Sequence, residues 1–270
     1  MSSSSLRSTA KAFPTLMKVG FSEAVAYRAE MLVWVLATTM PLVMMALWTA
    51  VARDAPIGRF GETEFVAYFL ATFIVRQLTG SWAAWQMNFE VRQGTLSMRL
   101  LRPLSPIVAW AVEHLAAIPL RLVVAIPIAV VMLATVGGGH LPSTFLGWLM
   151  WVAAVIGGWA ITFLVGICVG CLAFFMEQSM KIMDVWLALY FVFSGYLIPV
   201  ELFPGALREV VDWLPFRYQI GLPVELLTSR YALGDAAWML LRQWALVFGF
   251  ALLAWGLWRA GLKRFAAYGG

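Results

Sequence analysis

The stretch that decides the fold runs from Thr144 to Met176 and reads TFLGWLMWVAAVIGGWAITFLVGICVGCLAFFM. It has no charged residue over 33 positions. A helix of about 20 apolar residues crosses the hydrocarbon core of a bilayer, so this stretch can span a membrane with tilt and protrude from it. Because every backbone polar group needs a partner inside lipid, the stretch predicts a transmembrane helix.

The whole chain shares this apolar character. Of its 270 residues, 62% are hydrophobic and only 12% are charged, and the mean hydropathy is +0.84. Soluble domains average about 45–50% apolar and about 25% charged residues. This composition excludes a disordered or fibrous chain and argues against a soluble enzyme. Two cysteines, Cys168 and Cys171, are too few for a disulfide scaffold, and we interpret them as small packing residues.

Five further segments are nearly free of charge and have lengths near that of a bilayer. We therefore predict a single all-α membrane domain over residues 1–270, with a loose Ser-rich tail at residues 1–9. Apolar residues at helical spacing predict an amphipathic helix at residues 13–29, with Pro14 in its first turn, lying on the membrane or packed on a partner protein. The six predicted spans cover residues 31–52, 65–88, 106–138, 144–176, 182–198 and 236–258.

The distribution of Lys and Arg predicts the orientation. With the N-terminus inside, the N-terminal tail, residues 90–105, residues 177–184 and the C-terminal tail hold 11 of the 19 basic residues, and the outer segments hold five. Cytoplasmic loops of membrane proteins are enriched in Lys and Arg. Both termini are therefore expected in the cytoplasm, and the net charge of +5 indicates orientation rather than binding of nucleic acid.

Residues 89–106, FEVRQGTLSMRLLRPLSP, are too apolar for a plain connecting loop on the inner side. Gly94 allows a turn, Pro103 ends a short helix, and arginines surround Leu96 and Leu100. An apolar patch rimmed by arginines is typical of a docking surface for a cytoplasmic partner or for lipid headgroups. A loop that simply rests on the bilayer fits the composition equally well.

The outer segment 195–216 contains three prolines, Pro199, Pro204 and Pro215. Between Pro204 and Pro215 there is room for one short amphipathic helix, which is too short to cross the bilayer. We expect an interfacial or re-entrant helix here, between the fifth and sixth spans.

Three motifs carry a resemblance to a known family. They read Glu90-x-Arg92-x-Gly94-x-Leu96 followed by Leu100-Leu101-Arg102-Pro103, Ile198-Pro199-x-x-Leu202-Phe203-Pro204 followed by Leu214-Pro215-Phe216, and Gly261-Leu262-Lys263-Arg264-Phe265 with Tyr268-Gly269-Gly270. Their order across six spans resembles ABC-2-type transporter permeases, with the antibiotic-resistance and daunorubicin-type branch as the nearest group.

The resemblance implies a transport subunit of the bacterial cytoplasmic membrane rather than an enzyme, with no catalytic residues of its own. It implies a second six-span permease, identical or homologous, and two ATP-binding subunits that carry ATP and Mg²⁺. This chain has no Gly-x-x-x-x-Gly-Lys-Ser/Thr motif to cradle phosphates. In the family, the segment matching Glu90–Arg102 is the coupling helix that docks into the ATPase. The resemblance also implies that the transporter exports an amphipathic, lipid-linked or drug-like cargo.

Arg76 is an isolated charge near the middle of the second predicted span. A charge at that depth costs at least about 2.5–3.5 kcal/mol, so it should face protein or water. We expect Arg76 either to pair with Glu113 or to line the substrate path. A metal site is not expected, because His114 stands alone.

Two other classes of membrane protein fit the sequence less well. An ion-coupled secondary transporter favours several acidic residues at the midplane, and only Glu113 lies near a span interior. An intramembrane enzyme would need a Gly-x-Ser-Gly nucleophile or clustered aspartates in the spans, and the sequence has neither.

Overall fold

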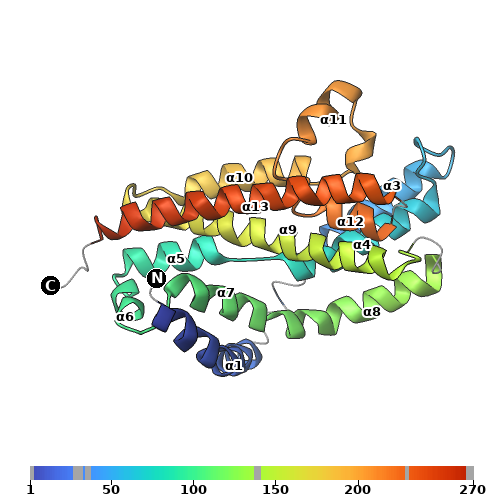
Figure 1. The fold of residues 1–270 in the computed structure, drawn as a ribbon. Coiled ribbons are helices and arrows are strands. Elements are labelled where there is room, and N and C mark those ends of the chain that lie inside the picture. Colours follow the sequence, from blue (N-terminus) through green and yellow to red (C-terminus); the bar gives the residue numbers. More distant parts are fainter. Residues whose placement is uncertain (1–2, 27–32, 34–37, 137–140, 229–230, 266–270) are drawn as a thin grey trace.

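The computed structural model describes residues 3–26, 33, 38–136, 141–228 and 231–265. Within these ranges every regular element is a helix, and the helices form an elongated bundle (Figure 1). The α-helices are α1 (Ser3–Ala26), α3 (Met40–Ala52), α4 (Glu62–Thr79), α5 (Ala83–Arg92), α6 (Leu96–Leu100), α7 (Pro106–Ala116), α8 (Ile118–Val136), α9 (Phe145–Cys171), α10 (Met180–Phe193), α11 (Gly205–Val211), α12 (Gly221–Thr228) and α13 (Leu233–Leu262). Short 3₁₀ turns are η2 (Leu172–Phe174) and η3 (Val200–Leu202).

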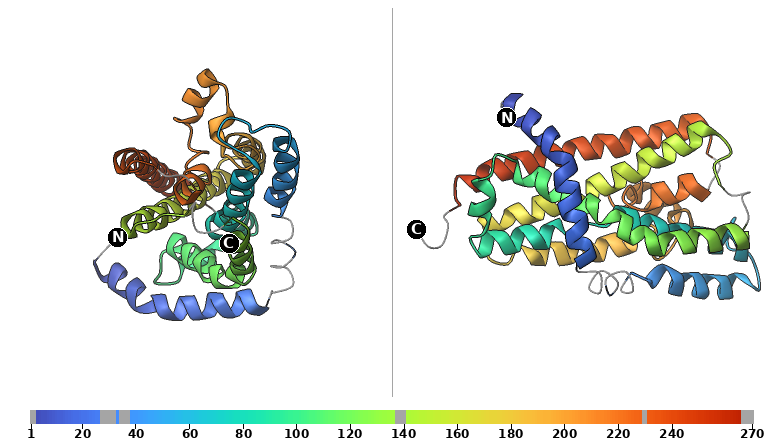
Figure 2. Two further views of the ribbon diagram at one scale, coloured as in Figure 1. Left: turned by 90° about the vertical axis from the view of Figure 1, so that its right-hand side faces the viewer. Right: turned by 90° about the horizontal axis from the view of Figure 1, so that it is seen from below.

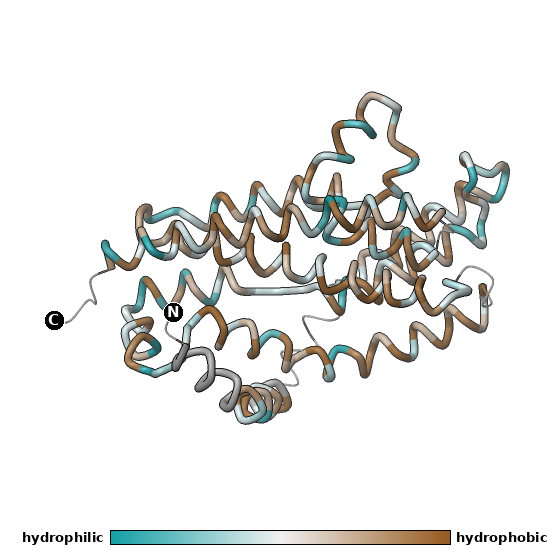
Figure 3. Tube along the Cα trace, in the orientation of Figure 1, coloured by the Kyte–Doolittle hydropathy of each residue, from teal (hydrophilic) through white to brown (hydrophobic). Residues whose placement is uncertain are grey.

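The all-α membrane fold is confirmed. Among the residues that the structure describes, three segments are long and apolar enough to cross a bilayer: Pro106–Val136, which combines α7 and α8, Phe145–Phe174 and Leu233–Leu262. They coincide with the third, fourth and sixth predicted spans. Long stretches of α8 and α13 are brown in the hydropathy view (Figure 3), and side chains such as Phe248 and Leu252 are exposed on α13. Exposed apolar side chains of this kind are what lipid-facing helices carry.

The other three predicted spans differ in detail. The second is broken, because α4 ends at Thr79 and α5 begins at Ala83. Gly80 ends α4 with an extended backbone (φ −66°, ψ 140°), which stops the helix. The fifth ends at Phe193, five residues earlier than expected. Of the first, the structure describes the helix α3, and most of residues 31–39 lie outside the described part, so six crossings stay a prediction.

The N-terminal helix is longer than the sequence suggested. The predicted loose tail is wrong from residue 3 onward, because α1 begins at Ser3 and Pro14 lies inside it rather than in its first turn. α1 runs across the bundle at a steep angle (Figure 2) and contacts α7. At the contact, a Cβ added to Gly20 would lie 2.9 Å from Ala116 Cβ, so the two helices touch closely. The end expected at residues 27–29 lies outside the described residues, and a position on the membrane surface stays a prediction.

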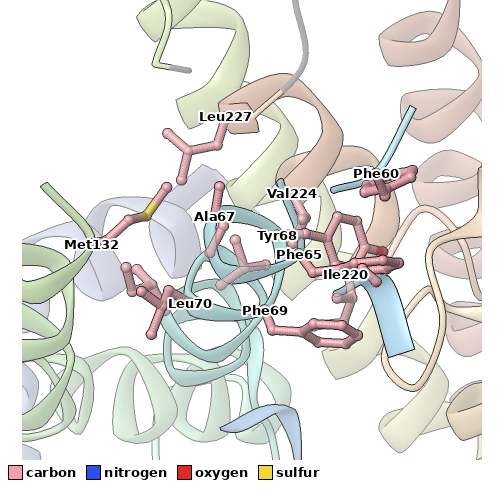
Figure 4. Packing of buried hydrophobic residues seen from close by; sticks show 14 of the residues in the cluster. Phe60, Phe65, Ala67, Tyr68, Phe69, Leu70, Met132, Ile220, Val224 and Leu227 are labelled. Carbon is pink, nitrogen blue, oxygen red and sulfur yellow. The ribbon is translucent and has the colours of Figure 1, made fainter. Parts of the chain in front are cut away.

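An aromatic cluster fills the core between α4, α8 and α12 (Figure 4). Phe65 and Phe69 of α4 are fully buried and stack with ring centroids 6.3 Å apart. The Tyr68 hydroxyl donates a hydrogen bond of 2.7 Å to the Gly195 carbonyl, where φ is +85°. This bond ties α4 to the turn that follows α10.

The helix α9 is central, with α13, α5, α12 and α4 packed around it. Two glycines on one face of α9 allow α5 to approach closely: Cβ atoms added to Gly166 and Gly170 would lie 3.1 Å from Ala83 Cβ and 2.8 Å from Met87 Cβ of α5. Cys168 and Cys171 are buried and free, as expected of packing residues. On the other side, the buried Gln243 of α13 donates hydrogen bonds of 2.8 Å to the carbonyls of Ala154 and Tyr218.

The two ends of the bundle carry different connections. α6, the start of α10 and the end of α13 lie at one end, whereas the α3–α4 connection, the end of α8 and the start of α9 lie at the other (Figure 1). This separation agrees with the two sets of segments that the basic residues distinguish. Which end faces the cytoplasm stays a prediction.

Candidate functional site

The segment predicted as a coupling helix is an elbow rather than one helix. The last turn of α5 reaches Arg92, Gly94 turns the chain with φ +71°, and α6 adds only the five residues Leu96–Leu100. Leu96 is fully buried among residues such as Val91 and Trp110. The expectation that Leu96 meets a partner is therefore wrong, because its side chain is used inside this chain.

The exposed side of the elbow consists of other apolar residues. Met98 is 64% exposed, Leu101 is 81% exposed and Leu100 is 37% exposed. Arg102 is exposed immediately after α6. An apolar surface beside an arginine is thus present, as the sequence indicated, but it is centred on Met98 and Leu101.

Arg99 holds the elbow in place. Its Nε lies 2.8 Å from Glu90 Oε2 of α5, and its Nη1 lies 2.7 Å from Glu113 Oε1 of α7. The guanidinium also lies 5.7 Å from the ring centroid of Trp110, whose Nε1 donates to Glu90 Oε1 at 3.2 Å. Burial alone would lower the pKa of Arg99, but the two carboxylates outweigh it and the pKa is raised. Glu90 is therefore an internal anchor of the elbow.

Arg92 connects the elbow to the next turn on the same end of the bundle. Its Nη2 donates a hydrogen bond of 3.3 Å to the Met176 carbonyl. One turn earlier on α5, the Asn88 amide donates to the Ser179 hydroxyl at 2.6 Å. The turn that precedes α10 is therefore fixed against α5.

A chain of hydrogen bonds leads from the elbow into the bundle. Glu113 Oε2 accepts from the Gln86 amide at 2.7 Å, and Gln86 Oε1 lies 3.0 Å from His114 Nε2. His114 Nδ1 lies 2.8 Å from the Ser81 hydroxyl. Because the Gln86 amide nitrogen donates to Glu113, its oxygen accepts, and this assigns the His114 proton to Nε2. The chain runs from Arg99 to Ser81, which lies in the break between α4 and α5.

Arg76 and Arg121 both lie beside the break between α4 and α5. Arg121 Nη1 donates to the carbonyls of Gln77 at 3.3 Å and Gly80 at 2.9 Å, which are left open where α4 ends. Arg76 also lies close to Gly80, because a Cβ atom added there would be 3.1 Å from its Nη1. The expected pairing of Arg76 with Glu113 is wrong, because Glu113 is bound by Arg99. Helical spacing along the chain does not reveal which way α7 is rotated, and α7 turns Glu113 toward α6.

At the other end of the bundle, the three prolines mark element boundaries as expected. Pro199 precedes η3, Pro204 precedes α11, and Pro215 follows α11 by four residues. The predicted short helix is confirmed as α11, which projects from the bundle (Figure 1). Its expected apolar face is divided, because Val211 is fully buried whereas Val210 is 56% exposed.

Sequence reasoning missed a buried ionic cluster behind α11. Arg217 Nη2 lies 2.6 Å from Glu225 Oε2, and both residues are almost fully buried. Arg217 also pairs with Asp212, and the Tyr231 hydroxyl donates to Glu225 Oε2 at 2.8 Å. Burial opposes the charge of Arg217, but Glu225 raises its pKa. The signal in the sequence was a pair of opposite charges, eight positions apart, within an apolar stretch.

Glu225 belongs to α12, whose residues Gly221 to Leu227 are all buried. α12 packs against α4 and α9. A Cβ added to Gly221 would lie 2.9 Å from the Ser194 carbonyl oxygen, so α12 begins in direct contact with the end of α10. α12 is thus a second short helix between the fifth and sixth predicted spans, after the segment where the interfacial or re-entrant helix is expected.

These elements define a class of protein. The bundle is apolar, one end carries an anchored elbow with an exposed apolar tip, and the other end carries an inserted short helix. Within the part of the chain that the structure describes, no three His, Cys, Asp or Glu side chains gather where they could hold a metal ion. The arrangement is that of a helical membrane protein.

The chain belongs to the ABC-2 family of transporter proteins, whose model matches residues 30–269. It is therefore a permease of an ABC transporter, a class that associates with an ATP-binding subunit. A comparison with curated proteins finds no match. The nearer resemblance to the daunorubicin-type branch stays a prediction.

Proposed function

We propose that this chain is the permease of an ATP-driven exporter in the bacterial cytoplasmic membrane, with both termini in the cytoplasm. Two permeases, identical or homologous, form the transport path, and two ATP-binding subunits supply ATP and Mg²⁺. The cargo is amphipathic, lipid-linked or drug-like. Membership of the ABC-2 family and the grouping of basic segments at one end of the bundle support this proposal.

The observation that carries the docking part of the proposal is the two-sided character of the elbow. One side is fixed internally by Leu96 and Arg99, and the other exposes Met98 and Leu101. Burial of one leucine contributes about 1.5–3 kcal/mol, so a partner that covers Leu101 gains affinity. Arg92 and Arg102 are exposed near this tip and can bind acidic groups on the ATPase.

The ion pairs of Arg99 support transmission of force. Because Arg99 binds α5 and α7 together, a displacement of α6 moves both helices rather than bending a loop. The hydrogen-bond chain through Gln86 and His114 then reaches Ser81 at the break of α4 and α5. A break in a helix is a place where two rigid segments can change their angle. ATP-driven closure of the partner would act on the membrane helices through this route.

The composition of the complex tests the proposal. We expect the tagged permease, purified from its native membrane in a mild detergent, to co-elute with an ATP-binding subunit in equal amounts. The mass of the particle should equal that of two permeases and two ATP-binding subunits. A permease that elutes as a monomer or dimer with no ATP-hydrolysing partner, under several detergents, would contradict the proposed function.

A further inference from the structure

The break between α4 and α5 brings two positive charges to one point. If Gly80 carried a Cβ atom, that atom would lie 3.1 Å from Nη1 of Arg76 and 3.1 Å from Nη1 of Arg121. The two guanidinium groups therefore approach the same position beside Gly80. Like charges at such short range repel each other unless an anion lies near them.

Both arginines lie at mid-height in the bundle. Arg121 is the middle residue of the 31-residue segment Pro106–Val136. Arg76 comes 14 residues after the start of α4 at Glu62 and 16 residues before the end of α5 at Arg92. At a rise of about 1.5 Å per residue, each arginine lies on the order of 20 Å from either end of its segment. In a bundle that spans the bilayer, this depth is far from the phosphates of the lipids.

The guanidinium groups of Arg76 and Arg121 differ in how many of their nitrogen atoms have hydrogen-bond partners. Arg121 is 8% exposed, donates to two carbonyls of α4 and lies 5.1 Å from the ring centroid of Trp82. Arg121 therefore stabilises the open end of α4. Arg76 is partly exposed and its Nε has no hydrogen-bond partner.

The aromatic neighbours of Arg76 leave its charge uncompensated. Its guanidinium lies 5.8 Å from the ring centroid of Tyr190. Neither Arg76 nor Arg121 pairs with a carboxylate of a residue that the structure describes, and Glu113 is already bound by Arg99. Phenol rings favour a cation but do not neutralise it.

We propose that Arg76 binds an anionic group of the cargo, a phosphate or a carboxylate, with Arg121 adding to the positive field behind it. This inference rests on the proposed transport function and names the class of its substrate, an amphiphile with an anionic head. The guanidinium fork suits bidentate binding of either group. A cationic amphiphile would be repelled at this point, and bilayer lipids keep their phosphates at the interface.

Binding to the purified permease in an uncharged maltoside detergent tests the inference without the ATPase. The probes are oleoyl lysophosphatidic acid, which has a phosphomonoester, and oleoyl lysophosphatidylcholine, which has the same chain and no net charge. We expect the permease to bind the lysophosphatidic acid at least 10-fold more tightly by isothermal titration calorimetry. Arg76→Gln should remove most of this preference, and Arg76→Lys should keep much of it.

The matched control is Arg208→Gln, which removes an exposed arginine on α11 and should leave the preference unchanged. Gel filtration of each variant shows whether it is folded, and Arg76→Lys keeps the test valid if Arg76→Gln aggregates. Equal affinity of the wild-type permease for both probes overturns the inference, and so does a preference that survives in Arg76→Gln. An absent ATPase partner would instead count against the proposed function, because this binding needs no ATPase.

Discussion

Arg99 Nη1 and Glu113 Oε1 lie 2.7 Å apart, and this ion pair joins α6 to α7. An isolated helix of five residues is not stable in water, because the conformational entropy lost in forming its first turn outweighs the free energy of its few hydrogen bonds. α6 therefore owes its position to side chains, namely the buried Leu96 and the paired Arg99. The same contacts make it a suitable lever between a soluble partner and the membrane helices.

Removing the charge of Arg99 should loosen the elbow. In Arg99→Gln, Glu90 and Glu113 keep their charges and lose their shared counterion, so we expect the free energy of unfolding to fall by about 1.5–3 kcal/mol. Thermal unfolding of the purified permease in detergent measures the change. Arg102→Gln, three residues further on and exposed, is the control and should change the free energy by less than about 0.5 kcal/mol. Equal melting temperatures for the two variants would show that the ion pairs of Arg99 do not stabilise the elbow.

Close packing of α9 should make Gly158 intolerant of a methyl group. A Cβ at this position would lie 2.7 Å from the Gln219 carbonyl oxygen, which is backbone and cannot rotate away. We expect Gly158→Ala to lower stability by about 1–3 kcal/mol. Gly249→Ala in α13, which has open space around it, should be neutral or slightly stabilising. Unfolding in detergent compares the two, and an unchanged Gly158→Ala would mean that α9 and the 216–220 segment are further apart than described.

The buried ion pair of Arg217 and Glu225 should behave as a unit. Arg217→Leu leaves Glu225 charged and buried, which costs about 3–5 kcal/mol. The double variant Arg217→Leu, Glu225→Leu removes both charges and should be more stable than Arg217→Leu alone. The four melting temperatures of this mutant cycle give the coupling. Additive effects of the two substitutions would show that the pair is not coupled.

Accessibility to a membrane-impermeant thiol reagent checks the orientation. In a chain with Cys168 and Cys171 replaced by alanine, Ala206→Cys should react in intact cells and Thr95→Cys only after the membrane is opened. Both positions are exposed, so accessibility depends on the side of the membrane and not on burial. Reaction of Thr95→Cys in intact cells would reverse the arrangement.

The sequence was sufficient for features that depend on hydrophobic length and local residue types. The charge-free stretch at Thr144–Met176 predicts α9 because length alone decides a span, and the prolines at 204 and 215 delimit α11 because each restricts its own backbone. Gly166 and Gly170 predict a packing face because they lack side chains on the same side of one helix.

Features that depend on tertiary contacts were not predictable. The break after Thr79 occurs in an apolar stretch whose sequence predicts one continuous helix. Arg121 stabilises the break, because its side chain donates a hydrogen bond to the Gly80 carbonyl at the open end of α4. The partner of Glu113 depends on the rotation of α7 and on the fold of α6, which the linear spacing of residues does not contain. The burial of Leu96 follows from the same elbow, since a straight helix over Glu90–Arg102 would have exposed a different set of side chains.

The most direct test of the central proposal is the amount of ATP-binding subunit that stays on the tagged permease when Leu101 becomes Asp. Leu101→Asp alters an exposed side chain, so the permease should insert and fold normally. Val210→Asp, an equally simple change at the other end of the bundle, is the control. Losing about 1.5–3 kcal/mol of leucine burial corresponds to roughly 10- to 100-fold weaker binding. We predict that Leu101→Asp loses most of the ATP-binding subunit and of the co-purified ATP hydrolysis, whereas Val210→Asp keeps both. Wild-type retention by a normally inserted Leu101→Asp permease would contradict docking at the elbow and direct attention to residues 177–184.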